Sequence, residues 1–329
     1  MSSTSQSPKF SFIYHDPCND GFAAATALVM WAKRLELEYD LHPCNYGKPL
    51  PEVAAESIVI MADFSFPPDQ MIELASKCRG VIMLDHHLTA ARALPELREK
   101  IKAAKARVIP YINQMWSGAV LAYAFTEVFS NSYTFKQADW DYFFDVSPFL
   151  DALDTALEFP VLGIPKLFQY VQDRDLWQWS LPLSREFSEG LMLYPQTFED
   201  WEDLVMHFDW HFDHIVTLGK AAITYRDKIL SSVIPSRVFK MKIGGFVVPA
   251  VNLPGIFGSE AGNLLSKDQP FAASFSITGN EVLFSLRSTA PEGMDVEQIA
   301  KGYGGGGHYN AAGFRCSLGE FSAMIVEGE

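Results

Sequence analysis

VIMLDHHLTAAR, residues 81–92, places three ionisable side chains, Asp85, His86 and His87, directly after four apolar residues. The apolar run is too short for a helix and rich in branched residues, which is typical of a strand buried inside a parallel sheet. Burying a carboxylate beside two imidazoles is costly unless the side chains bind something. The segment therefore predicts a polar site at the carboxyl end of a buried parallel strand.

Alternating strands and helices are predicted around this segment. The runs with strand character are FSFIYH (10–15), SIVIMAD (57–63), GVIMLDHH (80–87) and ARVIPYI (106–112). Apolar residues at helical spacing occur in GFAAATALVMWAKRL (21–35), PDQMIELASKC (68–78) and SGAVLAYAFTEVF (117–129). This βαβ alternation predicts a doubly wound, mainly parallel sheet in an α/β domain.

The remaining chain changes character twice. An aromatic-rich helical region is expected over residues 135–225, followed by strand pairs at 238–253 and 271–288. The second pair is predicted to turn at Gly279-Asn280, and a short helix is expected at 295–303. We therefore predict a first domain over 1–200, a helical connector over 201–234, and a smaller α/β domain over 235–329, with a cleft between the two domains.

Composition limits the class of protein. The 329 residues, 48% of them hydrophobic and 13% aromatic, suit about two compact globular domains. No apolar run reaches the roughly 18 to 20 residues of a membrane span, and the start lacks the apolar core of a secretory signal. The four cysteines have no CxxC spacing, so reduced thiols are expected. A soluble, cytoplasmic protein without a membrane partner is the expectation.

The net charge of −14 argues against a protein that coats long nucleic acid, because such binding depends on phosphate neutralisation by Lys and Arg. A short anionic substrate remains compatible with this charge. A local cationic site or bound metal ions can hold a few phosphates on an acidic molecule.

Polar side chains follow three of the four predicted strands. His15 ends the first, with Asp20 soon after it, Asp63 ends the second, and the Asp-His-His triplet ends the third. The carboxyl ends of parallel strands meet at one edge, so these side chains should converge there. Clustered carboxylates require cations, and carboxylates mixed with imidazoles suit Mn²⁺, Fe²⁺ or Zn²⁺ better than Ca²⁺. Two such ions side by side are a device for phosphate-ester hydrolysis.

An ordered set of motifs resembles one family. YHDPCNDG (14–21), MADF (61–64), LDHH (84–87), VQDRDLW (171–177) and GYGGGGHYNAAGF (302–314) are similar to the DHH phosphoesterases with a C-terminal DHHA1 domain. Within that family the chain looks most like the oligoribonucleases (nanoRNases). The resemblance implies a metal-dependent phosphodiesterase that releases mononucleotides from short oligonucleotides. It also implies two divalent ions, with Mn²⁺ expected and Zn²⁺, Fe²⁺ or Mg²⁺ as alternatives.

The resemblance assigns metal ligands residue by residue. Asp63 would bridge the two ions, with His15 on one ion and Asp20 and His86 on the other. The downstream motif DRD offers either Asp173 or Asp175, and Asp173 is preferred.

The other two residues of the LDHH motif receive different roles. His87 would face the reacting phosphate or the leaving oxygen as a catalytic residue. Asp85 is a candidate for catalysis or metal binding, or it would orient a histidine from behind.

Cys18 departs from the family pattern, since most members have a carboxylate there. It is either a ligand to a borderline metal such as Zn²⁺ or Fe²⁺, or a small buried thiol beside a weakened metal site. Asp16 is a substitute carboxylate. The departure motivates one rival, a non-catalytic nucleotide-binding module. A second rival is a hydrolase of cyclic dinucleotides or small phosphoanhydrides.

The last motif predicts a substrate-binding site. Glycines let backbone N–H groups approach a phosphate, and an arginine in an apolar strand suits a bidentate phosphate contact. With the family resemblance, the expected substrate-binding residues are Arg287, Gly304, Gly305, Gly306, Gly307 and His308. The sequence leaves the oligomeric state open, and a homodimer is one possibility.

Two other patterns are given non-catalytic interpretations. His207, His211 and His214 share a helical face at zinc-like spacing, but the segment is predicted to connect the domains. Trp177 and Trp179 are predicted to pack beside the acidic motif, with base stacking as the alternative.

Overall fold

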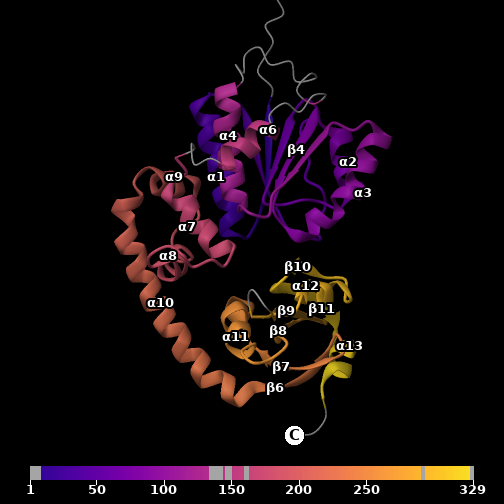
Figure 1. Cartoon of the computed structure of the whole chain (residues 1–329), viewed down its shortest axis with the longest axis vertical. Coiled ribbons are helices and arrows are strands. Elements are labelled where there is room, and N and C mark those ends of the chain that lie inside the picture. Colours follow the sequence, from indigo (N-terminus) through magenta and orange to yellow (C-terminus); the bar gives the residue numbers. More distant parts are fainter. Residues whose placement is uncertain (1–8, 133–143, 145–149, 159–162, 290–292, 327–329) are drawn as a thin grey trace, which may run out of the picture. The chain divides into compact units, whose positions relative to one another are not determined.

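The computed structural model describes residues 9–132, 144, 150–158, 163–289 and 293–326. The chain divides into two compact units, Met1–Ala221 and Ala222–Glu329, and each contains one sheet (Figure 1). The predicted α/β class, a parallel sheet followed by a second, smaller α/β part, is confirmed.

The first unit is built on a five-stranded parallel sheet in the order β2-β1-β3-β4-β5. Its strands are β1 (Phe10–His15), β2 (Tyr39–Cys44), β3 (Ile58–Ala62), β4 (Gly80–Asp85) and β5 (Val108–Ile112). The strand order reverses between β1 and β3. In open parallel sheets the carboxyl ends at such a reversal are the usual place for a ligand.

Helices cover both faces of this sheet, α1 and α4 on one side and α2 and α3 on the other (Figure 1). Successive strand residues alternate between the two cores, so Phe12 packs with the α1 and α4 side and Ile13 with the other. The helices of this unit are α1 (Asn19–Arg34), α2 (Pro68–Lys77), α3 (Leu88–Ala104), α4 (Gly118–Ser132), α6 (Leu150–Glu158), α7 (Lys166–Asp175), α8 (Ser184–Leu191) and α9 (Phe198–Met206). The long helix α10 (Phe208–Arg237) crosses from this unit into the next.

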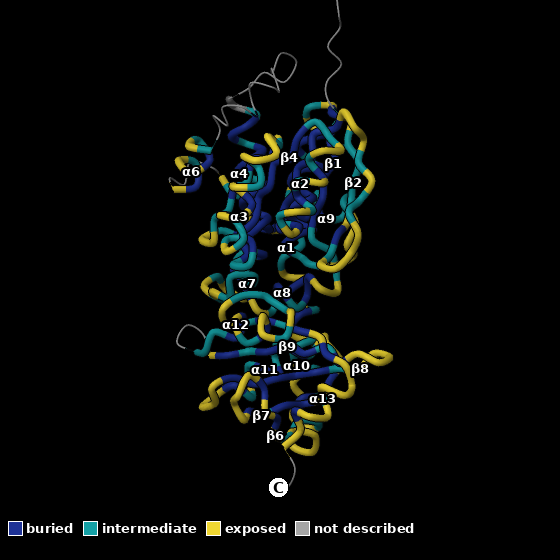
Figure 2. The backbone as a smooth tube through the Cα atoms, turned by 90° about the vertical axis from the view of Figure 1, so that its right-hand side faces the viewer, coloured by how far each residue is buried: buried dark blue, intermediate teal, exposed yellow. Residues whose placement is uncertain are grey.

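Two elements of the first unit were not expected from the sequence. Strand β2 lies at the sheet edge, where polar residues and Pro43 are tolerated, and most of it is half-buried (Figure 2). Helix α3 contains Pro95, a residue that normally marks a helix boundary. The helical character predicted for 135–225 is confirmed where the chain is described, and the rest of that region lies outside the described residues.

The second unit holds a six-stranded mixed sheet in the order β10-β11-β9-β8-β7-β6. Only the β7 and β8 pair among these neighbours is parallel in the described chain. The strands are β6 (Val238–Ile243), β7 (Phe246–Asn252), β8 (Ala272–Thr278), β9 (Glu281–Arg287), β10 (Gly306–His308) and β11 (Ala311–Ser317). The helices are η2 (Gly255–Phe257), α11 (Gly258–Leu265), α12 (Val296–Lys301) and α13 (Leu318–Met324).

The strand pairs predicted for this unit are confirmed, as is the short helix α12. The turn between β8 and β9 falls at Gly279-Asn280, where Gly279 has a φ of 61°. Among the helices in the described ranges, none is both long and apolar enough to cross a membrane.

Trp31 fixes α1 against α4 and the sheet. It is 2% exposed, its ring meets Phe10 edge-on at 5.3 Å, and its Nε1 donates to Ser130 Oγ at 3.1 Å. We expect Trp31→Ala to lower the free energy of unfolding of the first unit by about 3–5 kcal/mol, because it leaves a large cavity. Urea unfolding followed by circular dichroism measures the change.

Trp210, which is 86% exposed, provides the matched control. Trp210→Ala should change the free energy of unfolding by less than about 0.5 kcal/mol. Similar losses in both variants would show that α1 is not held by Trp31.

Candidate metal centre

The ends of three neighbouring strands bring the predicted ligands together. His15 is the last residue of β1, Asp63 directly follows β3, and Asp85 is the last residue of β4. The register aligns Tyr14 with Ala62 and Ala62 with Leu84, so the three strands end side by side. The site therefore lies at the reversal of strand order.

Asp63 turns away from the sheet in a left-handed conformation. Its φ is 57°, an unusual value for a residue other than glycine that aspartate tolerates better than most. Its backbone N–H still donates to the Leu84 carbonyl at 3.0 Å. Gly118, at the start of α4, makes room for it, because a Cβ there would lie 2.3 Å from the Asp63 Cβ.

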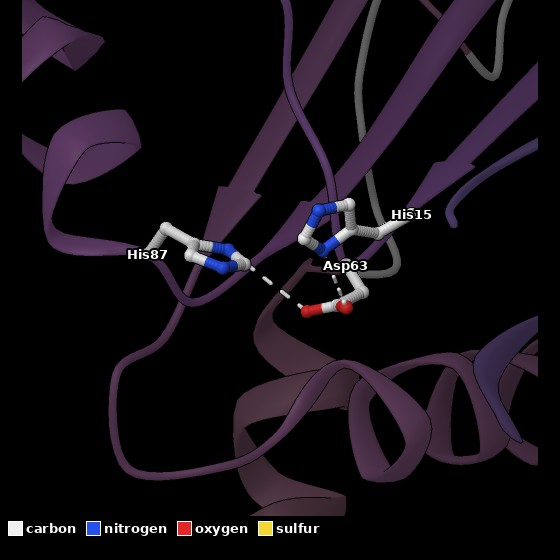
Figure 3. Close-up of side chains that lie close together, drawn as sticks. All are labelled: His15, Asp63 and His87. Atoms are coloured by element: carbon white, nitrogen blue, oxygen red, sulfur yellow. Dashed lines mark ion pairs between the residues drawn. The ribbon is translucent and has the colours of Figure 1, made fainter. Parts of the chain in front are cut away.

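The Asp63 carboxylate faces three imidazoles. Oδ2 lies 3.5 Å from His15 Nδ1, which is too long for a hydrogen bond, while Oδ1 lies 3.0 Å from His86 Nε2 and 3.9 Å from His87 Nδ1. Figure 3 shows this carboxylate facing the rings of His15 and His87. Asp63 is 1% exposed, so its charge is compensated by these side chains and not by bulk water.

A second group of side chains adjoins Asp63 through His86. His86 Nε2 lies 3.6 Å from Asp20 Oδ2 and 3.5 Å from Asp175 Oδ2. Asp20 is also held from behind, because its carboxylate accepts the N–H groups of Gly118 at 2.6 Å and Ala119 at 3.0 Å. A carboxylate at the start of a helix is favoured by the helix dipole, so Asp20 both caps α4 and reaches the site.

Asp85 lies outside these groups and fixes the two histidines. Its Oδ1 accepts the backbone N–H of His86 at 2.7 Å and of His87 at 3.0 Å, and lies 2.7 Å from His87 Nδ1. A carboxylate accepts here, so Nδ1 of His87 is the protonated nitrogen. This placement agrees with the orienting role considered for Asp85.

Charge balance in the site is governed by burial and by these neighbours. Burial alone would raise the pKa of Asp63, but His15, His86 and His87 outweigh it and hold that pKa below its usual range. Burial, followed by repulsion from Asp63 and Asp175, raises the pKa of Asp20 well above its usual value.

The histidine pKa values move in the opposite sense to that expected from burial. Burial would lower the pKa of His87, but Asp85 outweighs it and raises that pKa to about 9. For His86, the carboxylates of Asp175, Asp63 and Asp20 outweigh burial and raise the pKa well above its usual value. The protons on these rings therefore neutralise carboxylates in the metal-free protein.

The side chains fit divalent metal ions. Two sets have ligand atoms within 4.8 Å of one another, namely His15, Asp63 and His87, and Asp20, His86 and Asp175. Three atoms pointing into these sets, His15 Nδ1, Asp63 Oδ2 and Asp175 Oδ2, are buried and have no hydrogen-bond partner. Buried polar atoms without partners are costly, and nitrogen and carboxylate oxygen are suitable donors for Mn²⁺, Fe²⁺ or Zn²⁺.

The DRD motif supplies its second aspartate to the site. Asp173 is 2% exposed, and its carboxylate accepts the backbone N–H and Oγ of Ser180 at 2.8 and 2.6 Å and the N–H of Leu181 at 3.4 Å. Residues two positions apart on a helix are rotated by about 200° about its axis, so the side chains of Asp173 and Asp175 point in nearly opposite directions. The structure therefore brings Asp175 to the other candidate ligands, whereas Asp173, which the sequence-based prediction preferred, contacts the loop that follows α7.

Cys18 belongs to neither set of ligand atoms, although it lies near them. It is half-buried at the start of α1. Burial, followed by the negative charges of Asp63, Asp175 and Asp20, raises the pKa of its thiol well above the usual value. The thiol therefore keeps its proton in the metal-free protein.

Two of the histidines around the start of α10 lie against Asp203. Asp203 Oδ1 lies 2.8 Å from His207 Nδ1, and Asp203 Oδ2 lies 2.7 Å from His211 Nε2, while His214 is exposed. Across the described ranges, the sets with metal-ligand spacing are the two at the sheet edge.

The predicted substrate-binding residues lie in the second unit. Ala311 pairs with His308 on one side and with Arg287 on the other, so Arg287 and His308 share one face in one row of the sheet. The Arg287 guanidinium donates to Ser285 Oγ at 2.9 Å and Ser259 Oγ at 2.7 Å. Of the glycine run, Gly306 and Gly307 belong to β10, and Gly304 and Gly305 precede it.

Sequence reasoning missed the residues that position the ligands. A Cβ on Gly21 would lie 2.2 Å from the His15 carbonyl oxygen, so glycine is required where α1 approaches β1. Gln172 Oε1 accepts the Ser117 N–H at 3.0 Å and ties α7 to the start of α4. The sequence did contain one signal of close packing at these places: a glycine directly follows Asp20, and another directly follows Ser117, each at the start of a helix.

Comparisons with known proteins give distant similarities. No family model matches the chain. An uncharacterized protein of Acanthamoeba polyphaga mimivirus is 27% identical over 325 residues, covering 93% of this chain and 67% of that protein.

Several solved structures align along nearly the whole chain. PggH, a pGpG-specific phosphodiesterase from Vibrio cholerae, is 12% identical with a TM-score of 0.34, and the alignment covers 96% of each chain. An exonuclease RecJ bound to manganese is 16% identical with a TM-score of 0.44, covering 97% of this chain and 88% of that one. RecJ from Thermus thermophilus in complex with Mn²⁺ is 15% identical with a TM-score of 0.45, covering 97% of this chain and 51% of that one. The chain thus spans about half the length of the latter protein.

Gly118 tests how closely the site is packed. We expect Gly118→Ala to displace Asp63 and to weaken metal binding, because its methyl group collides with the Asp63 side chain. The overpacking should also cost about 1–3 kcal/mol of unfolding free energy. Isothermal titration with Mn²⁺ and thermal melting measure the two effects.

Gly163 is the matched control, because a Cβ there meets nothing within 4 Å. Gly163→Ala should bind Mn²⁺ as the wild type does. Unchanged metal affinity in Gly118→Ala would contradict the placement of Asp63 against α4.

Substitutions of the two aspartates in the DRD motif should have different effects on metal content and on thermal stability. Asp175→Asn should lower the amount of bound metal, because Asp175 Oδ2 points into the second set of ligand atoms. Asp173→Asn should retain metal but lower the melting temperature, because it weakens the hydrogen bonds to Ser180 and Leu181. Elemental analysis beside thermal melting decides, and the reverse pattern would restore Asp173 as the ligand.

Proposed function

We propose that the protein is a metal-dependent phosphodiesterase that hydrolyses short oligonucleotides to mononucleotides. The observation that carries this proposal is the buried Asp63 carboxylate, which belongs to the first set of ligand atoms, with Oδ2 3.5 Å from His15, and whose Oδ1 lies 3.0 Å from His86 of the second set. One carboxylate shared by two ligand sets is the arrangement that a pair of adjacent divalent ions requires.

In this proposal each set of ligand atoms holds one metal ion. His15 and Asp63 would hold one ion, and Asp20, His86 and Asp175, with Asp63, would hold the other. When bound, two such ions lower the pKa of a water molecule and stabilise charge on the oxygens of a phosphodiester. Gly118, Gly21 and Asp85 keep these side chains in place before any ligand arrives, which reduces the cost of ordering them.

His87 has the features of a group that serves the reacting phosphate. Asp85 holds its Nδ1 proton and sustains its positive charge, as the raised pKa of about 9 indicates. In this proposal the cationic ring stabilises negative charge on the phosphate or transfers a proton to the leaving oxygen. His87 also lies within the first ligand set, so a metal-binding contribution is tested together with this role.

Preference for short substrates would come from the second unit. Arg287 and His308, with the glycine run of residues 304–307, would bind a part of the substrate away from the scissile phosphate. Their common row on one sheet face supports this role. The net charge of −14 supports it as well, because long nucleic acid would be repelled outside such local sites.

The metal is proposed to be Mn²⁺. The two sets offer carboxylate oxygens and imidazole nitrogens, a mixture that Mn²⁺, Fe²⁺ and Zn²⁺ accept. Cys18 is proposed as a neighbouring thiol and not as a ligand, because it lies outside both sets and its pKa is raised.

The direct test is cleavage by the purified full chain. With Mn²⁺ it should convert di- to pentanucleotides of RNA into mononucleotides, and chelation with EDTA should abolish the reaction. Faster cleavage of a cyclic dinucleotide than of the linear one would favour the rival hydrolase. Tight dinucleotide binding without turnover in any of the four metals would favour the non-catalytic module.

Asp63→Asn is the sharpest variant for this test. The amide preserves shape but removes the charge shared by the two ligand sets, so turnover should fall by several orders of magnitude with the fold intact. Single-turnover cleavage of a labelled dinucleotide measures the loss, and circular dichroism checks the fold.

Asp69→Asn is the matched control, since the Asp69 side chain is 84% exposed on α2. It should turn over at the wild-type rate. Near wild-type turnover of Asp63→Asn at saturating Mn²⁺ would remove Asp63 from the proposed centre.

A further inference from the structure

Two arginines and two tryptophans form an alternating stack directly after the proposed ligand Asp175. The Arg174 guanidinium lies 4.5 Å from the ring centre of Trp177 and 5.3 Å from that of Trp179. The Arg185 guanidinium lies 4.7 Å from the Trp179 ring, and the two indoles meet edge-on at 4.9 Å. We call these four residues the Arg-Trp stack.

The backbone that presents this stack is unusual. Trp177 and Trp179 have φ values of 58° and 53°, a left-handed conformation that bulky residues adopt only under constraint. Two such residues in one short loop indicate a shape that the fold enforces, and enforced strain of this kind concentrates at functional sites.

Hydrogen bonds that do not involve the arginine side chains help to hold the loop. Asp173 anchors it from below through Ser180 and Leu181, and the backbone N–H groups of Trp177 and Gln178 donate to the carbonyls of Arg174 and Asp173.

Both guanidiniums lack a carboxylate partner. Within the described ranges, neither Arg174 nor Arg185 makes an ion pair, whereas Arg34 of the same unit pairs with Glu127 at 3.0 Å. A guanidinium stacked on an aromatic face keeps its edge N–H groups available, and these match a phosphate in bidentate geometry.

We propose that the Arg-Trp stack binds a terminal phosphate of the oligonucleotide substrate, beside the metal centre. Arg174 is next to Asp175 in the chain, and consecutive Cα atoms are about 3.8 Å apart, so the stack starts one residue from a proposed ligand. The metal ligands serve the scissile phosphate, and the stack holds a second phosphate of the same molecule. This inference rests on the proposed function.

A binding measurement tests the stack separately from catalysis. The probe is a dinucleotide with an uncleavable, uncharged methylphosphonate linkage, made with a 5′-phosphate, with a 3′-phosphate and with neither. Each is titrated into the Mn²⁺-loaded full chain by calorimetry. In the wild type, one terminal phosphate should strengthen binding about ten-fold or more, the size expected for hydrogen bonds to a charged group.

The variants identify the source of this gain. In the double variant Arg174→Ala/Arg185→Ala the gain should vanish, and in Arg174→Lys it should be reduced, because lysine keeps the charge but loses the planar stack. Arg34→Ala, which removes an ion-paired arginine, should keep the full gain. Thermal melting confirms that each variant is folded, and Arg185→Gln replaces the double variant if that one is unfolded.

The outcomes separate the stack from the proposed activity. A phosphate-dependent gain that persists without the arginines, or its absence in the wild type for both phosphate positions, would overturn the role of the stack. A gain that depends on the arginines, in a chain that cleaves no dinucleotide, would uphold the stack and overturn the proposed hydrolysis.

Discussion

The left-handed turn at Asp63 is the constraint on which the centre depends. It directs one carboxylate away from β3, into the set with His15 and His87 and within 3.0 Å of His86 of the other set, and it is accommodated only because Gly118 has no side chain. The same start of α4 is capped by Asp20 and tied to α7 through Gln172, and α7 ends at Asp175. Elements far apart in sequence are therefore fixed at one place by a few short contacts.

Electrostatics explain why this place suits a cation. Burial makes the charged form of Asp20 unfavourable, and its acidic neighbours add to the penalty. Protons on His86 and His87 offset part of the negative charge in the metal-free protein. At His86 a metal ion would replace the proton and would also satisfy the buried atoms that lack partners, so metal binding is coupled to proton release. A site arranged in this way adds little to stability until a metal ion is bound.

Much of the fold was predictable because buried parallel strands have short apolar runs in the sequence. The polar residues that end these strands lie at the same edge of the sheet, which brings them together. His15 and His86 both approach Asp63 for that reason. Edge strand β2 was not predictable, because an exposed edge imposes no apolar pattern. The choice between two aspartates on α7 needed the rotation of the helix about its axis, and the steric role of Gly118 is a contact between distant segments. Both depend on the three-dimensional packing of distant segments, which the spacing of motifs in the sequence does not reveal.

The central claim is that Asp63 is shared by two metal ions. The most direct measurement is anomalous diffraction from crystals of the full chain soaked in Mn²⁺, recorded at the manganese edge. The account predicts two anomalous peaks about 3.5–4 Å apart, each within coordination distance of one Asp63 oxygen. A single peak, or manganese bound at Asp203 and the histidines of α10 with none at Asp63, would contradict it.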